Sequence, residues 1–156
     1  MKLAEALLEK KNLAGRISEL QGRYTAAAVI EEGNQPDESA EDLLNSLVAA
    51  FAQWEALTVN INLANNRVVV GERTMMQALA HRDSLKTQIF HFSAITSTIR
   101  QRNSSRHYYQ EIGQKMIVVE GVDVKAFIKR VDDLSQELRL LDAAIQKANW
   151  DNELTA

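Results

Sequence analysis

Apolar residues recur at helical spacing in four segments of the chain. In residues 2–28 the apolar positions lie three, four or seven apart, as they do on one face of an α-helix. Similar stripes run through residues 39–64 and 74–102. A fourth stripe, after residue 123, alternates steps of three and four, which is the heptad pattern of a coiled-coil seam. The members of this seam are Val124, Phe127, Val131, Leu134, Leu138, Leu141, Ile145 and Ala148.

The second segment carries more apolar residues than one neighbouring helix would cover. Leu44, Val48 and Phe51 widen a stripe that already repeats every three or four residues. Such a wide stripe predicts packing against more than one neighbour. Four long helices that each need to bury a stripe predict an all-α fold, a helical bundle formed by a single domain over residues 1–156. The stripe itself consists of Leu43, Leu47, Ala50, Trp54, Leu57 and Ile61.

Turn and strand residues lie between the predicted helices. Ser39 or Asp37 is suited to cap the second helix, and Thr74 and Asp123 precede the third and fourth. The strand candidates are two short valine-rich runs, residues 67–70 and 115–119. Because so short a strand needs a partner, we predict that the two runs pair with each other, either within one chain or between subunits. Pairing between subunits predicts a homo-oligomer. Residues 103–114 are predicted to form a loop.

Composition narrows the range of functions. The chain has no cysteine, which excludes disulfides and zinc–thiolate sites. Its net charge is −3, so we expect no nucleic-acid partner, because such proteins usually carry a basic surface. Charged residues interrupt the leucines at the N-terminus, and no apolar run approaches the ~20 residues of a membrane span. We therefore expect a cytoplasmic protein.

The motifs of common enzymes and metal proteins are missing from the sequence. His81, His91 and His107 lack the glutamate three residues earlier that di-iron helical bundles use. Nucleotide-binding and nucleophile-elbow motifs are also missing. We therefore predict no catalytic residues, no metal and no cofactor. The basic, aromatic residues 100–109 could contact nucleic acid or acidic lipid, but a loop at the end of a helix explains them more simply.

A set of polar residues is predicted to set the register of the helices. Arg139 and Asp142 lie three apart, so they share a helix face beside Leu138. We predict that charges at these positions pair with those of the third helix, or across subunits, and so specify register. Asparagines near the end of the second helix are predicted to form helix-end or interhelix hydrogen bonds, with ligand contact as the alternative. The candidate residues are Asn62, Asn65, Arg82, Asp83, Arg139 and Asp142.

Several strings of residues carry a resemblance to a known family. They include INLANN at 61–66, ALAHRDSLK at 78–86, LRLLDAAIQKANW at 138–150 and the following DNEL. Together they resemble a family of small bacterial proteins of poorly defined function, many of which are labelled "septicolysin". That label implies a thiol-activated pore-forming toxin. Such toxins are large β-rich proteins with a cysteine in a tryptophan-rich loop, whereas this chain has no cysteine and two tryptophans.

Three functions are compatible with these features. The first is a non-enzymatic, self-assembling helical bundle that serves as a structural or interaction protein, with itself as partner. The second is a septicolysin-like cytolysin or membrane-perturbing protein. Only this second function would make a membrane a partner. The third is an enzyme whose site is shared between subunits.

Overall fold

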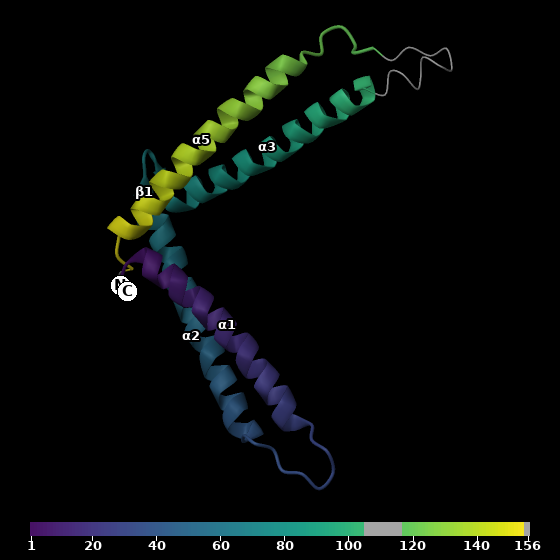
Figure 1. Cartoon of the computed structure of the whole chain (residues 1–156). Helices are drawn as coiled ribbons and strands as arrows, with labels where there is room; N and C mark the ends of the chain where they lie inside the picture. The colour runs from purple at the N-terminus through teal and green to yellow at the C-terminus, as the bar shows by residue number, and fades with distance from the viewer. Residues whose placement is uncertain (105–116, 155–156) are drawn as a thin grey trace, which may run out of the picture. The chain divides into compact units, whose positions relative to one another are not determined.

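The computed structural model describes residues 1–104 and 117–154, and this part of the chain is mainly helical (Figure 1). A two-stranded antiparallel sheet connects α2 to α3. The mainly helical class predicted from the apolar periodicity is therefore confirmed. The helices described are α1 (Leu3–Ala28), α2 (Ala40–Arg67), α3 (Met75–Ser104) and α5 (Val124–Asp151).

Side-chain caps begin two of the helices. Ser39 precedes α2, and its hydroxyl oxygen accepts a hydrogen bond from the backbone N–H of Asp42 at 3.2 Å. Asp123 precedes α5, and its carboxylate accepts one from the N–H of Ala126 at 3.0 Å. These bonds satisfy N–H groups that lack a partner in the first helical turn. Local chemistry therefore places both starts where the sequence predicts them.

The described chain divides into two compact units. The first contains residues 1–76 together with the segment from Gln146 onward. Here α1 and α2 lie side by side as an antiparallel hairpin (Figure 1). Leu20 of α1 packs with Leu43 and Ala50 of α2 in a buried cluster. Nearer the start of α1, the Lys10 ammonium lies 4.9 Å from the centroid of the Trp54 ring, a cation–π contact that crosses the same interface.

The two ends of the described chain also meet in the first unit. The N–H of Leu3 donates to the carbonyl oxygen of Asn152 at 3.0 Å, and the N–H of Leu154 donates to that of Met1 at 2.8 Å. The Lys2 ammonium lies 3.6 Å from the carboxylate of Glu153. These bonds pair the residues at the start of α1 with those after α5.

The second unit contains residues 77–145, in which α3 and α5 lie side by side (Figure 1). The rings of Phe92 and Phe127 contact each other with centroids 5.9 Å apart. The predicted seam of α5 faces inward: Leu134 and Ile145 are buried, as is Ala148 in the first unit, and the other five members are half-buried. The side-by-side packing of all four helices and the single domain stay predictions.

The short sheet differs from the sequence prediction. Strand β1 (Val69–Val70) pairs with β2 (Arg73–Thr74) in the registers Val69↔Thr74 and Val70↔Arg73. The predicted pairing of residues 67–70 with 115–119 within one chain is therefore wrong; residues 117–119 form no strand, and 115–116 lie outside the described residues. Pairing between subunits stays a prediction. Pairing with the next residues along the chain closes a far shorter loop, which costs less entropy.

Predicted features of the α3–α5 connection are only partly described. The predicted loop at 103–114 begins later than expected, because α3 continues to Ser104. The cluster Arg106, His107, Tyr108 and Tyr109 lies outside the described residues.

Gly71 makes the tight turn between β1 and β2 possible. Its φ is 63°, in the left-handed region that glycine adopts without steric cost. We expect Gly71→Ala to destabilise the protein by about 1 kcal/mol, through backbone strain alone, because no other atom lies within 4 Å of the added methyl. Gly15→Ala and Gly22→Ala, inside α1, should instead stabilise by about 0.5–1 kcal/mol. Urea unfolding of the three variants tests this; a loss at all three positions would contradict it.

Candidate interaction surface

A row of apolar side chains on α2 faces away from α1. Its five large members are exposed, from 43% for Leu44 to 60% for Val48. The buried residues of α2, such as Leu43, Ala50 and Ile61, lie on the other side of the helix. We call this row the outer face of α2, and it consists of Leu44, Val48, Phe51, Ala52, Ala56, Val59 and Leu63.

The outer face of α2 follows from the wide stripe seen in the sequence. Leu44, Val48 and Phe51 were predicted to pack against a second neighbour, but their side chains are exposed in the structure. Between Leu44 and Leu63 the sequence contains one acid, Glu55, and no base. Over a helix length of about 28 Å, a single carboxylate is therefore the only charged group. The other polar side chains there carry uncharged groups such as amides and hydroxyls.

A second apolar area lies on the first unit, where α1 meets the end of α5. It is a shallow pocket of about 600 Å³ whose apolar lining includes Leu7, Leu8 and Trp150. The Trp150 side chain is 59% exposed. This surface also leaves large apolar groups in contact with water.

Two of the predicted register residues contact each other. The guanidinium of Arg82 contacts the carboxylate of its neighbour Asp83, with Nη2 3.3 Å from Oδ1. On α5, Arg139 is exposed and Asp142 is half-buried. The pairing of these charges across helices or subunits stays a prediction. On α2, Asn62 is exposed at the edge of the outer face and Asn65 is half-buried, and their role as register or inter-subunit contacts also stays a prediction.

A polar contact that the sequence did not predict joins α3 to α5. His81 Nε2 lies 2.7 Å from Oε1 of Glu137. The apolar periodicity of the sequence could not identify this pair, because the contact between His81 and Glu137 depends on how α3 and α5 are aligned. Among residues 1–104 and 117–154, no three His, Asp or Glu side chains gather closely enough to hold a metal ion.

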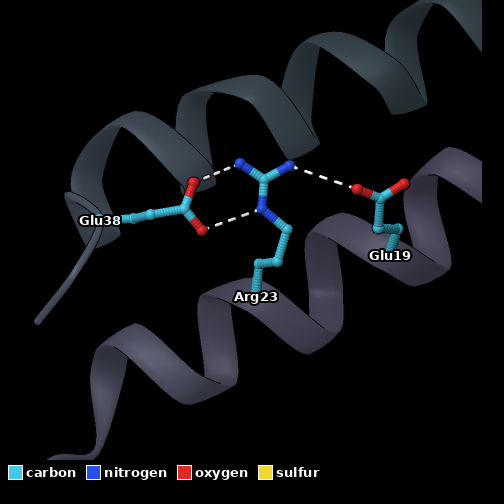
Figure 2. A network of polar contacts seen from close by, with 3 residues as sticks. All are labelled: Glu19, Arg23 and Glu38. Atoms are coloured by element: carbon cyan, nitrogen blue, oxygen red, sulfur yellow. Dashed lines mark hydrogen bonds and ion pairs between the residues drawn. The ribbon is translucent and has the colours of Figure 1, made fainter.

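An arginine clamp, which the sequence alone does not predict, joins α1 to the start of α2 (Figure 2). Arg23 Nε donates to one oxygen of Glu38 at 2.9 Å, and Nη2 donates to the other. Nη1 donates to Glu19, one turn earlier on α1, at 3.4 Å. The hydrogen bonds from Arg23 hold the pKa of Glu38 below the usual glutamate range.

The clamp predicts a pH dependence with a definite sign. The pKa of Glu38 is lower in the folded than in the unfolded chain. Its carboxylate therefore stabilises the folded chain at pH values above the ordinary glutamate pKa. That contribution is lost as the pH falls through the lowered pKa. It should be small, because the side chains are exposed. NMR titration should show the Glu38 midpoint rise toward the ordinary value in Arg23→Ala and stay low in Glu19→Gln; an unchanged midpoint in Arg23→Ala would refute the clamp.

No helix in the described part of the chain is both long enough and apolar enough to cross a bilayer. This holds for α2 despite its outer face, because polar residues such as Asn45, Gln53 and Glu55 interrupt its apolar residues.

Comparisons with known proteins place the chain in a family. No curated protein matches it. A solved structure, described as the crystal structure of a functionally unknown conserved protein from Corynebacterium diphtheriae, is similar along the whole chain. The two are 30% identical, the similarity covers 99% of each chain, and the TM-score is 0.83. A family model described as "Family of unknown function (DUF6847)" matches residues 10–154. The chain therefore belongs to this family of unknown function.

Proposed function

We propose that this protein is a non-enzymatic helical protein that assembles with copies of itself and serves a structural or interaction role in the cytoplasm. The observation that carries the proposal is the outer face of α2. Five large apolar side chains are exposed there in one row, on a helix whose opposite side already packs against α1. Exposed apolar rows of this kind typically mark interaction sites.

The energetics favour covering this face. Removing apolar surface from water is worth about 25 cal/mol per Å², or about 1.5–3 kcal/mol for a large side chain that becomes fully buried. Val48, Phe51 and Leu63 each still expose at least half of their surface. A partner helix that covered the row would recover much of this free energy, and a second copy of the chain provides such a helix.

Light scattering over a wide range of protein concentration tests the proposal. We expect a molar mass above that of one 17.5 kDa chain, with dissociation on dilution. A molar mass of one chain at the highest concentration would contradict self-assembly.

Membrane perturbation, which the septicolysin resemblance implies, is the alternative, and the same outer face supports it. Amphipathic helices that lie on membranes combine an apolar face with a polar face rich in lysine and arginine. On α2 the charged residues are mainly acidic, with Glu41, Asp42 and Glu55 against Arg67. Anionic lipid would repel these acids, so we favour assembly. Dye release from anionic and neutral vesicles distinguishes the two: release that Val48→Glu abolishes would support the alternative.

A further inference from the structure

We infer that the outer face of α2 packs against the same face of a second copy, with the two helices antiparallel about a two-fold axis level with Gln53 and Trp54. The inference rests on the proposed self-assembly and specifies the surface and the geometry by which it occurs.

The order of the large aliphatic residues along the outer face is the same in both directions. Reading outward from the midpoint between Gln53 and Trp54, valine occurs at 48 and 59, asparagine at 45 and 62, and leucine at 44 and 63. A two-fold interface uses the same patch on both subunits, so residue i contacts j while j contacts i. Two-fold symmetry imposes this exchange on any sequence, and here it brings like residues level with each other when the helices run antiparallel.

The pairing places apolar side chains at the centre of the contact. In this register Val48 lies level with Val59 of the second copy. The two positions differ by only about 20° around the helix and lie near the middle of the outer face, so the two valines meet across the contact. Leu44 lies level with Leu63 near the ends of the row.

The charges at the ends of α2 favour the same orientation. Glu41 and Asp42 lie in the first turn and Arg67 in the last. Antiparallel pairing brings the acidic turn of one copy beside the basic turn of the other, and it also opposes the two helix dipoles. Parallel pairing would bring acid beside acid and base beside base. The charge distribution therefore selects the antiparallel dimer over the parallel one.

One residue opposes the pairing. The two copies of Glu55 would lie on the same side of the contact, separated by about 4.5 Å along the helix axes. Carboxylates so close repel each other. Glu55→Gln should therefore tighten the dimer several-fold, whereas Glu9→Gln on α1 removes the same charge from an exposed position away from the face and should not.

A charge at the centre of the face tests which surface is used. Val48→Glu should raise the dimer dissociation constant, measured by sedimentation equilibrium, at least tenfold. Gln53→Glu adds the same charge to the same helix at an exposed position off the face and should change it less than threefold. Since both positions are exposed, circular dichroism should show native helix content in both variants. A dimer that both substitutions weaken equally would overturn the inference.

The absence of cysteine from the chain allows a direct test of orientation. In the antiparallel register two copies of position 48 lie about 16 Å apart along the helix axes, too far for a disulfide. Mild oxidation of Val48→Cys alone, or Val59→Cys alone, should leave monomers on a denaturing gel. A mixture of the two variants should form cross-linked dimers. Efficient cross-linking of Val48→Cys alone would indicate a parallel pair and overturn the inference.

These outcomes separate this inference from the proposed function. A wild-type protein that stays monomeric contradicts both. Two other outcomes contradict only this inference: an oligomer whose dissociation constant is unchanged by Val48→Glu, or mixed cysteine variants that fail to cross-link. In either case the protein self-assembles, but not through the outer face of α2.

Discussion

Replacing Ala50 with aspartate is expected to unfold the hairpin of α1 and α2. Ala50 is 2% exposed and packs in the cluster formed with Leu20 and Leu43. A carboxylate there would lose its hydration without gaining a positively charged partner, which costs several kcal/mol. We expect a loss of about 4 kcal/mol or more, a large part of the stability of a typical domain.

The adjacent residue provides the control. Ala49 is exposed, so Ala49→Asp introduces the same group into the same helix without burying it. Its cost should be limited to helix propensity, about 0.5–1 kcal/mol. Urea unfolding followed by circular dichroism compares the two variants. Similar losses at positions 49 and 50 would mean that α2 does not bury the face seen in the structure.

Truncating Leu134 to alanine is expected to cost about 2–5 kcal/mol, the second large effect. Leu134 is 3% exposed and belongs to the predicted seam of α5. The loss combines the burial free energy of the removed methyl groups with the cavity they leave.

Leu140→Ala is the matched control for Leu134→Ala. Leu140 lies on the same helix but is 66% exposed, so its truncation should change stability by no more than about 0.5 kcal/mol. Thermal or urea unfolding measures both. If the larger loss occurred at Leu140, the face of α5 that meets α3 would be the wrong one.

The helices and their inner faces could be predicted from the sequence because their causes are local. The alternating steps of three and four from Val124 to Ala148 identify the inner face of α5, where Leu134 and Ile145 are buried. Ser39 and Asp123 are effective caps wherever a helix follows them, and both act as caps in the structure.

The pairing of the strands could have been predicted but was not. Two residues, Gly71 and Glu72, separate β1 from β2, and a two-residue link containing glycine is typical of a tight hairpin. Residues 67–70 were predicted to form one strand that needed a distant partner. Thr74 was assigned to the start of the following helix, whereas in the structure Arg73 and Thr74 form the second strand of a surface hairpin.

The contacts between helices could not be predicted, because they depend on alignment in three dimensions. Arg23 meets Glu38 only because the connection between α1 and α2 returns Glu38 to the level of Arg23. The same holds for His81 and Glu137, which lie 56 positions apart in the chain. Arg82 contacts Asp83 beside it, and its predicted pairing across helices or subunits stays a prediction.

The molar mass of the wild-type protein and of Val48→Glu, measured side by side by light scattering at the same concentration, tests the central claim most directly. We predict a dimer for the wild-type chain and a shift toward the 17.5 kDa monomer for the variant, with helix content unchanged in both. Monomeric wild-type protein, or a variant with the same mass as the wild type, would contradict assembly through the outer face of α2.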